Sequence, residues 1–418
     1  MKSTRFTFAA ALAVGALALA ACGGGGGTDE TGGTASGEAT GAGSGAAGSV
    51  QVLIGSSGDA ETRAVQDAVA AWSAESGTQA EVIVASDLAQ QLAQGFAGGN
   101  PADLFYMSAD QLHTFASNGS VMAYGDELSN ADAFYANLVD AFSIDGEFYC
   151  APKDFSTLAL VINDRLWEEA GLTDADYPTT WDELTSVAQT LTSDGVAGLG
   201  FGPELQRVGV FMAQAGGNLV EDGEAVVNSE ANVEALTYVQ ERMQDGSFAF
   251  SSDLGAGWGG EAFGKELAAM VIEGNWITGA MENDFPDVAY TVVELPAGPA
   301  GKGTIQYTNC WGIATDADAT DAAQELVEFL TTPEQQLAFA DAFGVMPSVE
   351  GAAADWIAAF PEMEAFINGA EYAINLPSMI GSADVIAEFN AQLTSLQSGN
   401  VQSMLDTVQG AMEAALRG

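Results

Sequence analysis

Tryptophan side chains are the residues of this sequence best suited to holding a small ring-shaped molecule. Trp276 follows an apolar run, Trp258 lies in a glycine-rich loop, and Trp311 follows Cys310 near the start of another apolar segment. An indole ring offers a wide apolar plane that can cover the C–H face of a pyranose. Tryptophan is also a common core residue. For Trp258 and Trp311 the core interpretation and the ligand interpretation remain equally open, and Trp276 is the preferred ligand contact.

Oxygen-bearing side chains supply the second half of such a site, because ligand hydroxyls bind to groups that accept or donate in a fixed array. Asp59, Glu61 and Asp110 follow apolar strand-like runs, and Asp154 and Ser156 come shortly after a proline. All five are candidate contacts. The chain holds 58 acidic residues, however, and a solvated surface group or a helix cap is the alternative role for each acid.

Charge and composition exclude several classes of function. The 418 residues include only 10 Lys and Arg, which gives a formal net charge of −48. Nucleic acids and anionic membrane surfaces are bound through basic patches, so neither is expected as a partner. The single histidine, His113, argues against a multi-histidine metal site and histidine catalysis. We expect no cofactor and no metal.

The N-terminus has the pattern of an export signal. Lys2 and Arg5 precede an apolar run at 6–21, which is too short for a typical membrane span. The run ends at Cys22, a pattern that resembles the bacterial lipoprotein box. We therefore expect residues 1–21 to be removed and Cys22 to carry lipid on the outer face of the cell membrane. Residues 22–49 are rich in glycine and read as a flexible linker.

The residues after the linker alternate between strand and helix patterns. Strands are predicted at 49–55, 80–84 and 103–107, with helices capped by Asp59 and starting near residues 87 and 108. This alternation predicts an α/β fold with a parallel sheet. Ligands of such sheets bind beyond the carboxyl ends of the strands, which puts 56–61 and 107–110 on one rim.

Further patterns complete the list of predicted elements. Asp145-Gly146 predicts a tight hairpin over residues 142–149. A helix is predicted near the C-terminus, because one apolar stripe runs through Val401, Met404, Leu405, Val408, Met412, Ala415 and Leu416.

A longer series of segments resembles a known family. It comprises FYCAPKDFSTLALVINDRLWEEAGL, PTTWDEL and QAGGNLV, then residues 268–276, 311–314, 329–336 and 345–347. In this order the segments resemble the family 1 extracellular solute-binding proteins of ABC importers, which include the maltose-binding proteins. The likeness covers nearly the whole chain after the linker.

The resemblance implies a two-lobe periplasmic-binding fold of the type II kind, with a multi-strand hinge and a ligand cleft between the lobes. Residues 50–153 with 311–350 would form the N-terminal lobe, and 154–310 with 351–418 the C-terminal lobe. The implied function is capture of a sugar or oligosaccharide by lobe closure and delivery to the permease subunits of an ABC transporter. The chain would act as a monomer and not as an enzyme.

The resemblance also assigns roles to individual residues. Trp276 matches a sugar-stacking tryptophan of the maltose-binding members, and Asn275 precedes it in the same motif. Met107 and Ser156 stand where those members carry a ligand-facing Trp and Glu, so maltose itself is not expected. Cys150 and Cys310 would lie on neighbouring hinge strands, which favours a disulfide; two buried free thiols are the alternative.

Two other functions fit the residues. The strong acidity permits a cationic ligand such as a polyamine, held by carboxylates and aromatic faces. With so many acids, a pair of carboxylates arranged as in a glycoside hydrolase also remains open. A cleft with several converging carboxylates would favour the polyamine, whereas tryptophan faces with amides would favour the sugar.

Overall fold

The computed structural model describes residues 49–418. These residues fall within one compact unit of the chain, Gly45–Gly418. The predicted signal peptide at 1–21, the predicted lipidation site Cys22 and the 22–48 part of the linker lie outside the described residues. Among the described helices, none combines the length and the apolarity needed to cross a bilayer.

Ten strands of the described part form one mixed sheet, whose order is β10-β7-β11-β6-β13-β3-β1-β2, with β12 beside β6 and β14 beside β13. Two short hairpins, β4-β5 and β8-β9, lie outside this sheet. The strands are β1 Val50–Ile54, β2 Ala80–Val84, β3 Leu104–Ser108, β4 Ser143–Ile144, β5 Glu147–Phe148, β6 Ala151–Asn163, β7 Ala197–Phe201, β8 Val220–Glu221, β9 Glu224–Ala225, β10 Phe248–Phe250, β11 Ala268–Gly274, β12 Tyr290–Val293, β13 Thr304–Ile313 and β14 Ala373–Ile374.

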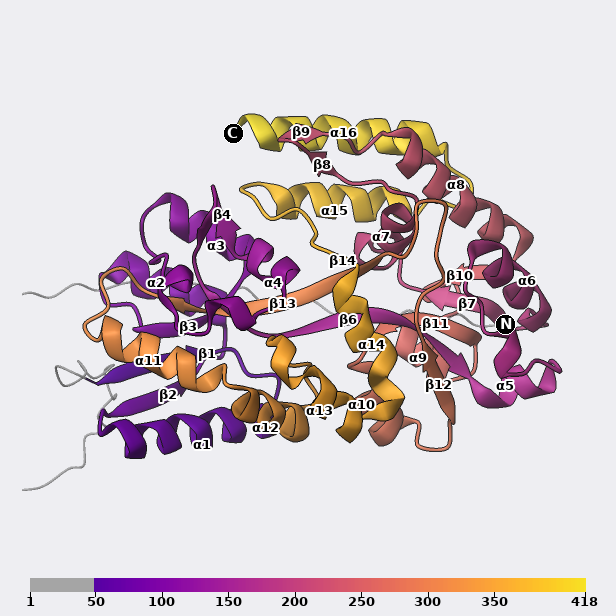
Figure 1. The fold of residues 1–418 in the computed structure, drawn as a ribbon. Coiled ribbons are helices and arrows are strands. Elements are labelled where there is room, and N and C mark those ends of the chain that lie inside the picture. The colour runs from indigo at the N-terminus through magenta and orange to yellow at the C-terminus, as the bar shows by residue number, and fades with distance from the viewer. Residues whose placement is uncertain (1–48) are drawn as a thin grey trace, which may run out of the picture. The chain divides into compact units, whose positions relative to one another are not determined.

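Helices flank this sheet, as Figure 1 shows. They are α1 Asp59–Ser76, α2 Leu88–Gly98, α3 Ala109–Ser117, α4 Ala136–Ala141, α5 Asp164–Glu169, α6 Trp181–Leu191, α7 Leu205–Gln214, α8 Glu230–Asp245, α9 Gly259–Gly264, α10 Ile277–Asp284, α11 Thr320–Leu330, α12 Pro333–Phe343, α13 Ala353–Ala359, α14 Glu364–Asn368, α15 Ser382–Leu393 and α16 Val401–Arg417.

The first strands and helices follow the predicted pattern. β1 pairs in parallel with β2 and with β3, so the predicted parallel α/β arrangement is confirmed here. Asp87 caps α2 by accepting a hydrogen bond from the Gln90 backbone N–H. One expectation was wrong: Asp59 is the first residue of α1, and Gly58 occupies the cap position. The predicted hairpin forms with Asp145 and Gly146 both at positive φ, as a tight two-residue turn of this kind requires.

The centre of the sheet is antiparallel, unlike its flanks. β6 pairs antiparallel with β13 through its first half and with β11 and β12 through its second half. β13 in turn pairs antiparallel with β3, and its register against β6 shifts between Asn309 and Cys310. Figure 1 shows β6 and β13 side by side through the middle of the sheet.

Strand β6 contributes to three hydrophobic clusters. Its Leu158 and Leu160 join a cluster that contains Trp181, whereas Phe155 and Val161 join another on the opposite face. This division follows from the two-residue period of a strand. A third cluster holds β1, β3 and α1, together with Ala151 at the start of β6 and Trp311 on β13.

A disulfide fastens these two strands together. Cys150 immediately precedes β6, Cys310 lies on β13, and their Cα atoms are 5.7 Å apart. Both sulfur-bearing residues are buried, with exposed fractions of 1% and 0%. The disulfide expected from the sequence is therefore present.

Candidate ligand-binding site

A cavity of about 640 Å³ lies among the described residues. Its walls come from the start of α3, from β6 and β13, from the start of α7, and from the segment that leads into α15. The lining side chains that the argument below uses are Asp110, Asp154, Ser156, Gln206, Trp276, Gln306, Tyr307 and Asn309. Four of them, Asp110, Asp154, Ser156 and Trp276, were candidate site residues from the sequence alone.

Trp276 presents an aromatic face to this cavity. It lies between the end of β11 and the start of α10 and is 38% exposed, more than any other tryptophan of the described residues. Its Nε1–H donates to Glu273 Oε2 at 3.0 Å, and its ring meets that of Tyr307 edge-on with 5.3 Å between centroids. The N–H is already bonded to protein, so the ring offers a ligand mainly its apolar face.

A buried ion pair lies behind this ring. Arg207, from the first turn of α7, donates through Nη2 to Glu273 Oε2 at 2.8 Å and through Nη1 to the Tyr307 hydroxyl at 3.2 Å. Burial raises the pKa of the Glu273 carboxyl, and the neighbouring guanidinium offsets this rise in part. The Arg207 guanidinium carbon lies 5.3 Å from the Trp276 ring centroid, within range of a cation–π contact.

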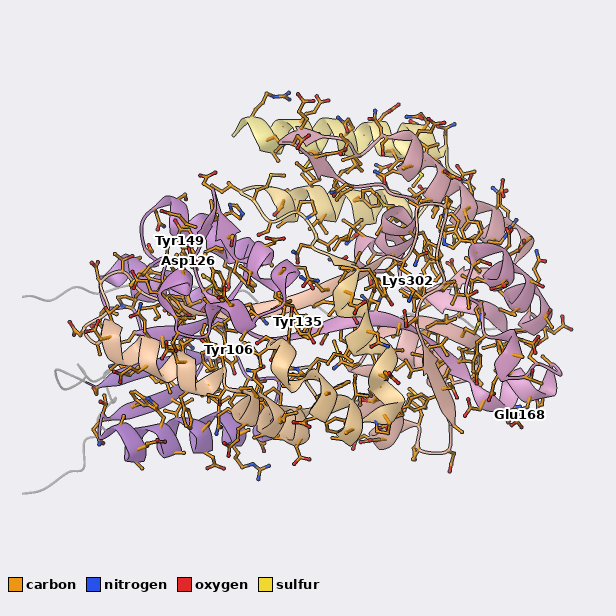
Figure 2. All side chains as sticks on the ribbon, in the orientation of Figure 1. Tyr106, Asp126, Tyr135, Tyr149, Glu168 and Lys302 are labelled. Atoms are coloured by element: carbon orange, nitrogen blue, oxygen red, sulfur yellow. A yellow bond between two sulfur atoms is a disulfide. The ribbon has the colours of Figure 1, made fainter. Side chains whose placement is uncertain are left out.

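A second buried charge cluster lies where α1 approaches the start of β6. Lys153 Nζ is 3.4 Å from Glu61 Oε1, is paired with Asp154 Oδ2, and lies 4.4 Å from the centre of the Tyr106 ring, which Figure 2 labels. Burial opposes the charge of Lys153, but Asp154 and Glu61 raise the pKa of its ammonium. For Glu61, burial is outweighed by Lys153 and by hydrogen bonds from Ser57, so the pKa of its carboxyl is lowered.

The remaining predicted contacts divide between the cavity and its surroundings. Asp110 is exposed on the first turn of α3, where the Ser108 cap also lines the cavity. Ser156 is half-buried on β6, paired in register with Tyr307. Asp59 is exposed on α1, and Glu61 is 4% exposed; neither lines the cavity.

Four further predicted contacts do not line this cavity. Met107 on β3 and Trp311 on β13 are each 1% exposed. Both belong to the hydrophobic cluster of β1 and β3. Trp258 is half-buried and packs against the cluster that holds Phe155. Asn275 is buried, and its side-chain amide donates to the Gly344 carbonyl at 2.8 Å.

Sequence reasoning missed several lining residues. Gln206 lines the cavity, and Arg207 lies beside it in the first turn of the helix that follows β7. The rule that ligands bind beyond strand ends, applied to β7, would have found this turn. Tyr307 and Asn309 lie on β13, and no local pattern marks them. Asn375 and its neighbours are brought to the cavity by long-range contacts: Gln306 donates to the Asn375 side chain, and the Ser378 hydroxyl donates to the Ala109 carbonyl on α3.

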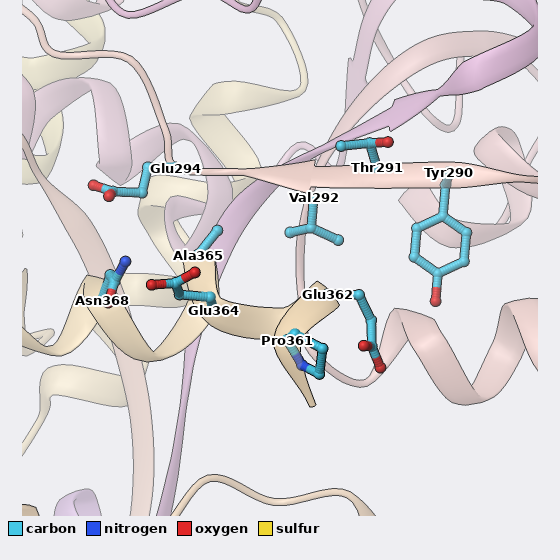
Figure 3. A pocket seen from close by; sticks show the side chains of 9 residues that line it. All are labelled: Tyr290, Thr291, Val292, Glu294, Pro361, Glu362, Glu364, Ala365 and Asn368. Atoms are coloured by element: carbon cyan, nitrogen blue, oxygen red, sulfur yellow. The ribbon is translucent and has the colours of Figure 1, made fainter. Parts of the chain in front are cut away.

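A second cavity of about 460 Å³ lies between β12 and the segment around α14. Figure 3 shows Glu294 and Asn368 at one end of it and Tyr290 and Glu362 at the other. No tryptophan lines it, and Glu294 is already engaged by Lys302 and by the Tyr372 hydroxyl. Within residues 49–418 no cluster of His, Cys, Asp and Glu has the make-up of a metal site.

The sequence is similar to the sequences of known binding proteins. The sequence profile of the family described as "Bacterial extracellular solute-binding protein" matches residues 67–365. A binding protein of Brucella abortus is 24% identical over 361 residues, covering 81% of this chain and 85% of that protein. The diacetylchitobiose binding protein DasA of Streptomyces coelicolor is 24% identical over 272 residues, covering 62% of this chain and 64% of that protein.

A solved structure extends the comparison to the fold. The cyclic α-maltosyl-1,6-maltose binding protein of Arthrobacter globiformis superposes with a TM-score of 0.78 at 21% identity, covering 88% of this chain and 99% of that one. The two-lobe α/β fold predicted from the sequence is therefore confirmed.

Proposed function

This chain belongs to the bacterial extracellular solute-binding proteins, and from that premise we propose that it captures a sugar or oligosaccharide for an ABC importer. The ligand would lie in the 640 Å³ cavity and be passed to the permease subunits of the transporter. That volume falls in the range of about 300–1,000 Å³ typical of small-molecule sites.

The half-exposed face of Trp276 carries this proposal. It stands in a cavity whose other polar groups are mostly amides and hydroxyls, among them Gln206, Gln306 and Asn309. Of the two lining carboxylates, Asp154 is already paired with Lys153, which leaves Asp110 as the acid most open to a ligand. An aromatic plane with amides suits a neutral sugar, whereas a polyamine would require several free carboxylates.

Closure of two lobes about strands β6 and β13 would trap the ligand. We propose that residues 50–153 with 311–350 form one lobe and 154–310 with 351–418 the other. The hydrophobic cluster of β1 and β3 draws its buried members from 50–151 and 310–352, which supports this division. A ligand that contacts both lobes favours the closed arrangement.

Attachment at Cys22 would keep the protein near its transporter. A diacyl anchor holds a protein stably at a bilayer, and residues 22–49 would act as the tether. We expect metabolic labelling with fatty acid to mark the protein and Cys22→Ser to remove the label. Label that persists in this variant would contradict the anchor.

Thermal-shift measurements on the purified chain test the ligand class. The panel contains maltotetraose, diacetylchitobiose and spermidine, because a ligand that binds only the folded state raises the Tm. A rise with either sugar and none with spermidine is expected, and a rise with spermidine alone would replace the sugar proposal with a cationic ligand. Chromatography of the sugars after incubation should find no cleavage; released monosaccharide would instead indicate a glycoside hydrolase.

A further inference from the structure

The Trp276 ring is fixed by protein contacts on several sides. Its Nε1–H is bound to Glu273, and Tyr307 meets the ring edge-on. The guanidinium of Arg207 lies over the ring, 5.3 Å from the centroid. These three contacts limit the orientations that the indole can adopt in the wall of the cavity.

Arg207 is itself held rigidly in this position. Its side chain is 13% exposed and binds Glu273, which is 1% exposed, and the Tyr307 hydroxyl. The Tyr307 hydroxyl in turn donates to the Gln206 carbonyl at 2.9 Å. The planar guanidinium binds two fixed partners at once and therefore has little freedom to move. It thus limits the movement of the Trp276 ring beside it.

The absence of a side chain at Gly274 leaves space for the Trp276 ring. A Cβ atom added at Gly274 would overlap Cζ3, Cη2 and Cε3 of the Trp276 indole. The benzene part of the ring therefore packs directly against the strand backbone at the end of β11. Any residue other than glycine would force the indole to rotate, while the strand itself could remain in place.

We propose that Arg207, Glu273 and Gly274 are positioning residues that hold the Trp276 ring in one orientation, so that a single face is presented to the ligand. None of the three needs to touch the ligand. This proposal rests on the proposed function for its effect on affinity, whereas the orientation of the ring can be tested without any ligand.

The ligand-free test uses Gly274→Ala. A rigidly held aromatic ring gives a near-ultraviolet circular dichroism signal. The Trp276 signal is obtained by subtracting the spectrum of Trp276→Ala from that of the wild-type protein. Gly274→Ala should lose this difference signal. Gly279→Ala is the matched control, because a Cβ atom there meets nothing within 4 Å and Gly279 lies only three residues beyond Trp276.

A second variant tests the cation behind the ring. Arg207→Lys keeps a positive partner for Glu273 but loses the planar fork, so folding is protected while the support of the ring is weakened. Its Trp276 signal should fall. Arg242→Lys is the control, because Arg242 also pairs with an acid and lies 5.8 Å from the centre of an aromatic ring, that of Tyr238, which is not among the residues lining the cavity.

Affinity decides whether the orientation matters for binding. With maltotetraose or diacetylchitobiose, whichever gives the larger thermal shift, Gly274→Ala should raise the Kd at least about tenfold, the loss expected when a stacking anchor is removed. In the Trp276→Ala background the same change should add nothing, because it acts through that ring. If Gly274 had only a structural role, Gly274→Ala would weaken binding equally in the wild-type protein and in Trp276→Ala.

The possible results separate the two proposals. An unchanged Trp276 signal in Gly274→Ala and Arg207→Lys, or additive losses of affinity, would overturn the positioning role. If the wild-type protein binds neither sugar, the proposed function fails for these sugars, and the Trp276 signal alone decides whether the ring is held as described.

Discussion

Trp276 and Trp311 are residues of one type whose surroundings give them different roles. Both were candidate contacts because of the segments they follow, yet one faces the cavity and the other lies in the core. Local sequence places a residue at a strand end, as for Trp276, but only strand pairing decides which face of β13 is covered. For the same reason Tyr307, which reaches Trp276 from β13, had no local signal.

The role of Trp276 can be separated from a core role by one pair of variants. Trp276→Ala should raise the Kd for the bound sugar at least about tenfold with little change in Tm, since the side chain is partly solvent-exposed. Trp258→Ala, which removes a half-buried ring outside the cavity, should lower the Tm and leave the affinity intact. Titration calorimetry and thermal melts on both proteins measure this, and the reverse pattern would return Trp276 to the core.

The lowered pKa of the buried Glu61 gives a pH-dependent contribution to stability. A carboxyl whose pKa is lower in the folded state stabilises the protein above its ordinary pKa and loses that contribution as the pH falls through the folded value. Glu61→Gln should therefore reduce the free energy of unfolding by about 2 kcal/mol at pH 7. The difference from wild type should shrink below about pH 4.

Urea unfolding of both proteins across this pH range tests the expectation. Asp59→Asn, an exposed acid on the same helix, is the control and should change stability by less than about 0.5 kcal/mol at either pH. A loss in Glu61→Gln that stays constant from pH 7 to pH 3 would show that its charge contributes nothing.

At the scale of elements, the periodicity of the sequence was sufficient to predict the first strands and α16. Alternating apolar runs identified β1, β2 and β3, and the stripe through Val401 and Met404 identified the last helix. The direction of pairing in the centre of the sheet was not predictable, because β6 is apolar on both faces and such a run carries no orientation. Pairing of β6 with β13 depends on contacts about 150 residues apart in sequence.

The disulfide between Cys150 and Cys310, which links β6 to β13, should stabilise the folded protein. It closes a loop of 160 residues, and Cys150→Ala with Cys310→Ala should lower the free energy of unfolding by about 2–5 kcal/mol. Denaturant unfolding of the variant and of the oxidised wild type measures the difference. Alkylation before reduction should modify neither cysteine, and two modified thiols in the exported protein would contradict the bond.

At the scale of the whole molecule, composition excluded classes of partner and the family resemblance supplied the fold. A net charge of −48 argues against nucleic acid but is compatible with many folds. The two-lobe fold followed from segments spread over nearly the whole chain, each of which is weak alone. The identity of the sugar did not follow, because the cavity combines residues from at least five separate segments.

Ligand-driven closure predicts a change in overall dimensions. Small-angle X-ray scattering should show a smaller radius of gyration when the wild-type protein is saturated with its sugar, because a ligand that binds both lobes favours the closed state. Trp276→Ala at the same sugar concentration should keep the larger value. A radius that does not change in the saturated wild type would argue that binding occurs without closure.

The position of strand β6 in the fold determines where the chain can be cut into fragments. Its thirteen residues pair first with β13 and then with β11 and β12, and its side chains enter three separate cores. A truncated product that ends within β6 would leave unpaired strand edges and exposed apolar surface on what remains. Single fragments should therefore be insoluble. Two complementary fragments produced in the same cell should associate and fold together.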